Sequence, residues 1–306
     1  MTGAPVPADA DTVVPVETCA EVTETTVRIS DTIPQGANLR RQGEEIAAGE
    51  LLIGRGTRLE AGHIALLSAQ GMMALSVYAP LRIAVISSGN ELKEPWEDAD
   101  EQEVHNANAF GILSLLESYG FSAEYHGRIS DEREATERMI AGLSRYDVII
   151  SSGGISQGAA DHLYAAFQAN GMETLFRGVR LKPGHPVTAG VMGGTLVLAL
   201  PGNPLATLLT LFVLGIPALR VWQGNVQPRH TEALARMDAP LTCRGGRSEL
   251  VLGQLESGRF RPVMGYRYGS GMITPLTQSN AVAVIPEEKT FLDAGEVISV
   301  IPIGRG

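Results

Sequence analysis

The chain has 306 residues, of which 44% are hydrophobic and 19% charged, a balance that is typical of folded domains and argues against intrinsic disorder. Its 24 lysines and arginines against 34 acidic residues give a net charge of −10, which disfavours binding along a nucleic-acid backbone. Two cysteines, Cys19 and Cys243, are too few for a disulfide framework or a cysteine-rich zinc site. Because the start MTGAPVPADADTVV also lacks the features of a signal peptide, we expect a cytoplasmic protein.

The N-terminal stretch predicts short strands and then one short helix. Runs rich in β-branched residues occur at Thr12–Val16 and Thr25–Ile29, and proline and acidic turns interrupt them. The following segment has a helical pattern that begins near Glu60 and ends just before Gly71.

From Arg82 to Trp222, buried-type strands alternate with helices. The expected strands are Arg82–Ser87, Ser122–Gly127, Asp147–Ser151, Val187–Val191 and Thr195–Leu200, and the expected helices are Asn108–Tyr119, Asp131–Ser144, Asp161–Asn170 and Pro204–Trp222. This alternation predicts a three-layer α/β domain with a mostly parallel sheet, whose ligands bind at the carboxyl ends of the strands.

One segment of this α/β stretch could be mistaken for a membrane span. The uncharged run Pro204–Leu219 is shorter than the ~20 residues that a bilayer helix needs, so we expect a buried core helix. After Trp222, short β runs with glycine and proline turns predict a small all-β domain.

Loops rich in small and acidic residues follow three of the expected strands. Glu91, Asp131 and Asp161 lie in these loops, and the third loop begins with Ser152-Gly153-Gly154. Each carboxylate alone could be a helix cap, and the glycines could form only a tight turn. Three acids at one edge of one sheet nevertheless favour a site for magnesium and phosphate, because carboxylates are ligands that Mg²⁺ prefers.

A basic segment, Arg177–Pro186, is expected to lie near the same edge. Arg180 and Lys182 could hold a phosphate or another oxyanion, although a solvated turn with basic side chains is the plain alternative. We expect Lys182 to be an exposed loop residue whose loss affects catalysis and hardly affects stability. Leu200–Pro204 begins the core helix, and its backbone donors would face the same edge.

In their order and spacing, the motifs SSGNEL, SSGGISQGAAD, LKPGHP and LPGNP resemble those of the molybdopterin molybdenumtransferases, which are similar to the E domain of gephyrin. Upstream, MTGAPVPADADTVVPVE and GANLRRQGEEIAAGELLIGRGTRL resemble further family segments, as do Gly269–Met272 and Ser279-Asn280 downstream. The resemblance implies insertion of molybdate into adenylylated molybdopterin with release of AMP, dependent on Mg²⁺. It also implies a homodimer, with the adenylyltransferase of the pathway as a further partner.

The resemblance assigns roles to individual residues. It implies that Glu91, Asp131 and Asp161 bind magnesium and act together with Lys182 in catalysis. The residues that it implies in binding the cofactor or an oxyanion are Thr2, Arg40, Ser152, Gly153, Gly154, Ser156, Gly158, Arg180, Pro183, Asn203, Arg247 and Ser270.

The patterns and the resemblance together divide the chain into four segments. These are a remnant of an N-terminal β domain (1–36), a helical or linker segment (37–77), the molybdopterin-binding α/β domain (78–224) and a C-terminal β domain (225–306). Family members begin with further segments before the MTGAP run, so we expect an N-terminally shortened chain.

Several positions depart from the family pattern. Glu45 replaces an aspartate, Asn90 and Asn106 replace acids, Gly178 stands at a commonly basic position, and His185 replaces a lysine, which makes the charge there depend on pH. Two alternatives to the active enzyme therefore stay open. One is a catalytically impaired molybdopterin-binding paralogue or scaffold module. The other is a stand-alone adenylyltransferase, against which the C-terminal β domain argues.

Overall fold

The computed structural model describes residues 3–29, 32–129, 132–154 and 162–304. The chain forms two compact units, residues 1–55 and 56–306.

The smaller unit contains one strand pair. β1 (Cys19–Val22) and β2 (Val27–Ile29) run antiparallel, and β2 confirms the strand expected near Ile29. The strand expected at Thr12–Val16 is wrong, because that run is irregular and leads into a 3-10 turn at Val16–Thr18. Pro15 offers a physical reason, since it has no N–H to donate to a strand ladder.

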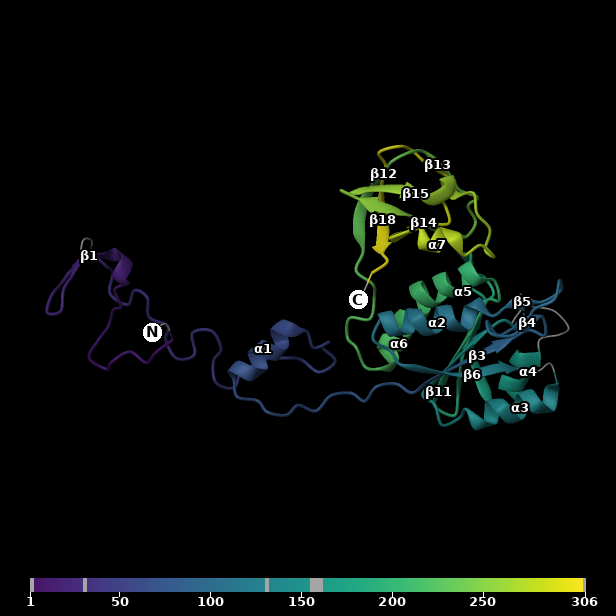
Figure 1. Cartoon of the computed structure of the whole chain (residues 1–306), viewed down its shortest axis with the longest axis horizontal. Helices are drawn as coiled ribbons and strands as arrows, with labels where there is room; N and C mark the ends of the chain where they lie inside the picture. The colour runs from purple at the N-terminus through teal and green to yellow at the C-terminus, as the bar shows by residue number, and fades with distance from the viewer. Residues whose placement is uncertain (1–2, 30–31, 130–131, 155–161, 305–306) are drawn as a thin grey trace. The chain divides into compact units, whose positions relative to one another are not determined.

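The larger unit begins with α1 (Ala61–Ala69) and contains a six-stranded sheet (Figure 1). The strand order is β6 (Ala123–Ile129), β3 (Ile83–Ser88), β7 (Val148–Ser152), β11 (Thr195–Leu200), β10 (Thr188–Met192) and β8 (Met172–Arg177). The first four strands are parallel, so their carboxyl ends share one edge, whereas β10 is antiparallel to both of its neighbours. The expected mostly parallel sheet is confirmed. β8 was not expected, and its largely exposed residues explain why it lacks a buried-strand pattern.

Helices cover both faces of this sheet (Figure 1). One face carries α2 (Ala107–Ser118), α5 (Pro204–Thr210) and α6 (Ile216–Trp222), and the other carries α3 (Arg133–Gly142) and α4 (His162–Ala169). Successive side chains of β3 point to opposite faces of the sheet, which explains the layers. Ile83 and Val85 belong to the core under the first set of helices, and Ala84 and Ile86 belong to the core under the second. The predicted three-layer α/β arrangement is confirmed.

The spacing of Phe110, Leu113 and Leu116 suggests one inward face for α2, but the structure turns a partly different face inward. Ala109, Ile112 and Leu116 are fully buried, whereas Phe110 remains 37% exposed. Phe110 instead packs edge-on against Trp96 at 5.9 Å between ring centroids. The small alanine on the inward face lets the helix approach the sheet, and the larger ring lies at its margin.

A continuous helix runs from Pro204 to Trp222 and is long and apolar enough, by composition alone, to cross a membrane. More than half of it is buried, and its apolar residues belong to the main core, so the expected buried core helix is confirmed. The helix widens into a π turn at Leu211–Gly215. Pro217 lacks an N–H and would clash with the carbonyl of Val213 in a regular helix, and the wider turn relieves that conflict.

A second six-stranded sheet follows the long helix. Its strand order is β15 (Arg259–Pro262), β12 (Ala233–Met237), β18 (Val297–Pro302), β16 (Ala281–Ile285), β14 (Ser248–Glu256) and β9 (Leu181–Lys182). Shorter elements are β4 (Leu92–Lys93) with β5 (Val104–His105), β13 (Leu241–Thr242) with β17 (Phe291–Leu292), a 3-10 turn at Val263–Tyr266 and α7 (Thr274–Thr277). The expected all-β sheet is confirmed, but its edge strand β9 comes from the α/β segment.

Candidate active site

The carboxyl ends of three parallel strands are held together by direct contacts. Gly153, which follows β7, donates its N–H to the carbonyl of Leu200 at the end of β11, at 3.1 Å. Its φ is +80°, and a Cβ at this position would collide with the carbonyl of Ser88 at the end of β3. The position therefore requires glycine. Gly153 thus lies where the ends of these three strands meet.

The structure describes one of the three expected magnesium ligands. Glu91 follows β3 directly, and its carboxylate lies beside Gly89, where a Cβ would be 2.8 Å from Oε1. The expected site residues Thr2, Asp131, Ser156, Gly158 and Asp161 lie outside the described residues. Within the described ranges, no group of three or more His, Cys, Asp or Glu side chains could hold a metal ion. The magnesium site therefore stays a prediction.

Two asparagines attach α2 to this edge. The side chain of Asn106 caps the helix by accepting from the N–H of Ala109 at 3.2 Å, and its amide donates to the hydroxyl of Tyr125 at 2.8 Å. Asn108 donates to the carbonyl of Gly202 at 2.7 Å. Asn106 stands where the resemblance expects an acid, and here it serves as a helix cap.

A groove of about 500 Å³ lies between the start of the core helix and the C-terminal sheet. The expected site residues Lys182, Pro183, Asn203, Arg247 and Ser270 all line it. The amide of Asn203 donates to Ser270 Oγ at 2.9 Å, which ties the loop before α5 to the C-terminal segment. Residues that are far apart in the sequence thus form one site.

Lys182 is not the exposed loop residue that we expected. It lies in β9, in parallel register with Glu249 of β14, and its Nζ is 3.0 Å from Glu249 Oε2. The side chain of Lys182 is 31% exposed and that of Glu249 only 2%. This ion pair argues against a negligible effect on stability, because the lysine neutralises a buried carboxylate.

Glu249 is held as an anion by several donors. The hydroxyl of Tyr266 also donates to Oε2, and the N–H of Arg244 donates to Oε1 at 2.5 Å. Burial acts to raise the pKa of Glu249, but the bonds from Tyr266, Lys182 and Arg244 outweigh it and lower the pKa below its usual value. Burial and the same carboxylate raise the pKa of Tyr266, and burial raises the pKa of Tyr268 to about 12.

Sequence reasoning missed four residues of this site, namely Arg244, Glu249, Tyr266 and Tyr268. The sequence offered one indication for Glu249, because this acid directly precedes the largely apolar run LVLGQL, and both belong to a mostly buried strand. An acid in such a strand needs a partner of opposite charge. Tyr266 has φ of +63°, a conformation that residues other than glycine seldom adopt and that often occurs at functional sites. No pattern in the sequence predicts that conformation.

The basic loop itself packs on the core helix. Gly184 has φ of +115°, and a Cβ there would collide with the hydroxyl of Thr210. His185 lines the groove and has its Nδ1 2.6 Å from the carbonyl of Val179. These contacts thus fix the segment that follows Lys182.

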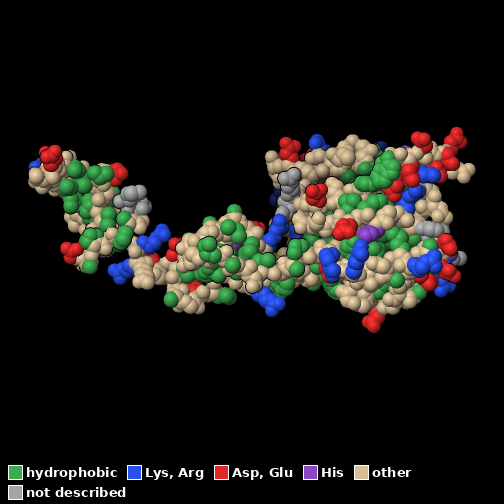
Figure 2. Space-filling view, turned by 60° about the horizontal axis from the view of Figure 1, so that its bottom comes forward, with side chains coloured by type: hydrophobic (Ala, Val, Ile, Leu, Met, Phe, Trp, Pro, Cys, Tyr) green, Lys and Arg blue, Asp and Glu red, His purple; other side chains and the backbone are tan. Residues whose placement is uncertain are grey.

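The groove is positively charged although the chain is acidic. Its described lining contains the cations Lys182, Arg244 and Arg247 together with His185 and no carboxylate, and the buried Glu249 behind it offsets one charge. Elsewhere on the larger unit, acidic and basic side chains are interspersed on the face that Figure 2 shows. Such a local excess of positive charge suits an anionic ligand.

Other expected site residues have partners elsewhere. Arg180 pairs with Glu287 at 2.8 Å, and Ser152 is buried at the end of β7. Arg40 belongs to the smaller unit, where it pairs with Glu45 at 3.2 Å.

Comparisons with known protein families agree along the chain. Residues 1–71 match the MoeA N-terminal region (domain I and II), residues 84–221 a probable molybdopterin binding domain, and residues 235–303 the MoeA C-terminal region (domain IV).

Two named relatives and one solved structure extend these matches. The molybdopterin molybdenumtransferase of Haemophilus influenzae is 29% identical, with 100% of this chain and 76% of the relative covered. Molybdopterin molybdenumtransferase 2 of Mycobacterium tuberculosis is 30% identical over 98% of this chain and 75% of the relative. The molybdopterin biosynthesis protein MoeA of Pyrococcus horikoshii has a crystal structure that superposes with a TM-score of 0.75, at 27% identity, over 97% of this chain and 73% of that one. The chain therefore belongs to the molybdopterin molybdenumtransferases, a family of transferases.

Proposed function

We propose that this protein inserts molybdate into adenylylated molybdopterin and releases AMP, as a step of molybdenum cofactor synthesis. The observation that supports this best is the groove in which Lys182, Asn203, Arg247 and Ser270 meet. Molybdate and the phosphates of the adenylylated substrate are all anions, and the groove presents cations and hydrogen-bond donors to them. Its volume of about 500 Å³ suits a ligand of this class.

The residues of the groove would act by electrostatic stabilisation. When the bond between AMP and molybdopterin breaks, negative charge develops on the departing phosphate, and Lys182 and Arg247 would stabilise it. Glu249 would act as a positioning residue, because its ion pair fixes the ammonium of Lys182 at the wall of the groove. Asn203 and Ser270 would supply neutral hydrogen-bond donors, so that no covalent protein nucleophile is required.

Magnesium is the metal that we propose for the edge of the sheet. Glu91, Asp131 and Asp161 would hold it, since they are hard oxygen ligands in the loops that follow β3, β6 and β7. The position of Glu91 supports this proposal, because its carboxylate lies beside Gly89, the residue that follows β3. A bound Mg²⁺ would neutralise phosphate charge. The remaining expectations also belong to this proposal: a cytoplasmic homodimer, the pathway's adenylyltransferase as partner, and the segments 1–36, 37–77, 78–224 and 225–306 as domains.

The proposal is tested by AMP release from adenylylated molybdopterin in the presence of molybdate and Mg²⁺. Arg247→Gln should slow release about a hundredfold, because loss of one oxyanion-stabilising donor typically costs ~3 kcal/mol of barrier. Arg261→Gln, which removes an exposed arginine of β15 outside the groove, is the matched control and should keep the parental rate. Equal rates in the two variants would contradict the assignment of this groove. Substrate binding without any AMP release would favour the impaired paralogue.

A further inference from the structure

A pocket separate from the groove lies at the carboxyl ends of β3 and β6. Its volume is about 620 Å³, and Glu94, Trp96, Tyr125 and Arg128 line it, together with Gly89, which follows β3. The remaining described lining residues carry no charge. We call it the Trp96 pocket. Glu94 and Trp96 both come from the segment between β4 and β5, so this segment forms one wall.

Trp96 gives the pocket an exposed aromatic surface. Its ring centroid lies 5.9 Å from that of Phe110, and the ring of Phe110 lies 5.8 Å from that of Tyr125. These contacts hold the indole in place, yet 72% of Trp96 remains exposed. An indole that is held by its neighbours and still exposed at a pocket suits stacking against a planar ring of a ligand.

Glu94 is a buried carboxylate with one oxygen unpaired. Only 7% of the residue is exposed. Its Oε1 accepts from the hydroxyl of Tyr125 at 2.7 Å and lies 3.5 Å from Nε of Arg128, whereas its Oε2 has no hydrogen-bond partner among the described residues. A buried charged acceptor without a donor is unfavourable, which points to a donor supplied by a ligand. Because the last torsion of a glutamate side chain is broad, the carboxylate can turn toward such a donor.

An ion pair with Arg128 does not by itself account for Glu94. Nη2 of Arg128 is 2.8 Å from Oε2 of Glu97, so a different carboxylate already neutralises this guanidinium at a shorter distance. Two carboxylates beside one cation leave an excess of negative charge at the pocket. That excess disfavours a phosphate group here and favours a ligand that presents hydrogen-bond donors.

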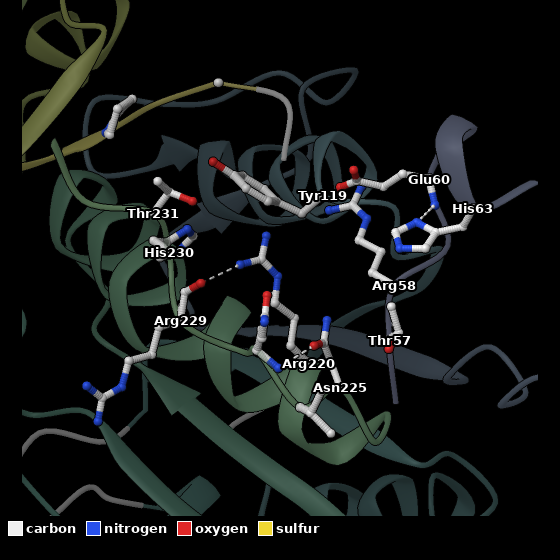
Figure 3. A pocket seen from close by; sticks show the side chains of 14 residues that line it. Thr57, Arg58, Glu60, His63, Tyr119, Arg220, Asn225, Arg229, His230 and Thr231 are labelled. Atoms are coloured by element: carbon white, nitrogen blue, oxygen red, sulfur yellow. Dashed lines mark hydrogen bonds between the residues drawn. The ribbon is translucent and has the colours of Figure 1, made fainter. Parts of the chain in front are cut away.

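A pocket beside the end of α6 shows the contrast (Figure 3). Figure 3 shows the carboxylate of Glu60 next to the guanidinium of Arg58, and Arg220 donates to the carbonyl of Arg229 at 3.4 Å. These charged groups have partners within their own pocket. Glu94, in contrast, keeps an oxygen for which the described part of the chain supplies no donor.

One end of the proposed substrate matches these features. A pterin is a planar ring system whose pyrimidinone edge carries adjacent N–H donors, whereas adenine places an acceptor nitrogen beside its amino group. An ionised carboxylate only accepts, so it fits the first edge and repels the acceptor of the second. We propose that the Trp96 pocket binds the pterin ring of adenylylated molybdopterin, with Glu94 accepting from the pyrimidinone edge and Trp96 stacking on the ring. This inference rests on the proposed function.

The order of the strands is consistent with this orientation of the substrate. β6, β3, β7 and β11 are neighbours in that order, and strands lie ~4.8 Å apart, so the pocket and the loop after β11 are separated by roughly 10–14 Å. Glu91 and Gly153 follow the strands β3 and β7 in this interval. A pterin bound at β3 and β6 would therefore direct the phosphates along the strand ends, toward the cations of the groove.

The two tryptophans of the chain make the pocket observable. Trp222 ends α6, far along the chain from the pocket, and serves as an internal reference. In protein labelled with ¹⁵N in its indole rings, each tryptophan gives one N–H signal, and Trp222→Phe assigns the two. Free pterin, which carries no phosphate, should shift the Trp96 signal along a saturating curve and leave that of Trp222 unchanged. AMP at the same concentrations should leave the Trp96 signal in place.

Glu94→Gln replaces the unpaired acceptor by an amide and should weaken pterin binding about tenfold or more. Glu103→Gln is the matched control, because it removes a carboxylate from the same segment, where Glu103 pairs with Lys93 outside the described lining of the pocket. It should keep the parental affinity. If Glu94→Gln fails to fold in a circular dichroism melt, Trp96→Leu, at an exposed position, must weaken pterin binding about fivefold or more in isothermal titration calorimetry.

The outcomes separate this inference from the proposed function. A Trp96 signal that does not saturate with pterin, or a folded Glu94→Gln protein with parental affinity, overturns the inference. A response of Trp96 to AMP in place of pterin also overturns it, while the proposed function stands, since AMP release is measured separately. Saturable pterin binding that depends on Glu94 supports the pocket even if AMP release is absent, and in that case the proposed function alone fails.

Discussion

Replacing Lys182 by alanine removes the partner of a nearly inaccessible carboxylate. Loss of one member of a buried ion pair costs about 3–5 kcal/mol when the other charge is left unpaired. Here Lys182 is 31% exposed, so solvent already screens the pair. Glu249 also retains its bonds from Tyr266 and from the N–H of Arg244. We therefore expect Lys182→Ala to lower the free energy of unfolding by about 1–3 kcal/mol, or the melting temperature by roughly 2–6 °C.

A double-mutant cycle measured by urea unfolding checks this expectation. Glu249→Gln in the Lys182→Ala background removes the uncompensated charge, so the double variant should recover most of the lost stability. It should not recover AMP release, because the cation that stabilises the departing phosphate is still absent. Additive losses, or a Lys182→Ala protein within ~0.5 kcal/mol of the parent, would refute the ion-pair reasoning. Recovery of activity in the double variant would refute the catalytic role of Lys182.

Three further changes test other parts of the structure. Burial lowers the pKa of His230, so below pH 6.5 the unfolded chain takes up a proton that the folded chain does not. The free energy of unfolding should therefore fall as the pH drops from 7.5 to 5.5. His230→Gln should reduce that fall when unfolding is measured by urea titration. Gly153→Ala should cost ~2 kcal/mol or more, whereas Gly258→Ala, also at positive φ but with open space around its Cβ, should cost about half as much in the same assay. Asn106→Ala should cost ~1 kcal/mol through loss of the α2 cap, which a parental melting temperature would contradict.

Local patterns predicted most of the central sheet because β3, β7, β10 and β11 are largely buried on both faces. The run Asp147–Ser151 is continuously apolar apart from its ends, and β7 forms at Val148–Ser152. The core helix was equally predictable, since its long uncharged run begins at a proline. Elements that are buried on one face only, or hardly buried at all, were harder to predict from the sequence, and the exposed edge strand β8 was missed.

The groove was predictable only in part, because its key contact is not local. Lys182 was identifiable from its basic segment and from the resemblance, and Arg247 from the resemblance alone; the structure brings them together. The ion pair of Lys182 with Glu249 joins residues 67 positions apart through a two-residue strand. A strand of that length has no periodicity that a sequence could reveal. No pattern in the sequence therefore indicates that Lys182 is partly buried in an ion pair.

The central claim, that this chain inserts molybdate with release of AMP, is tested most directly by a single-turnover reaction of the purified protein. Adenylylated molybdopterin bound to the chain is mixed with Mg²⁺, with and without molybdate, and both AMP and protein-bound molybdenum are quantified. We predict that molybdate triggers AMP release and that one molybdenum is incorporated for each AMP formed. AMP release that ignores molybdate, or stable binding of the adenylylated substrate with no release, would contradict the claim.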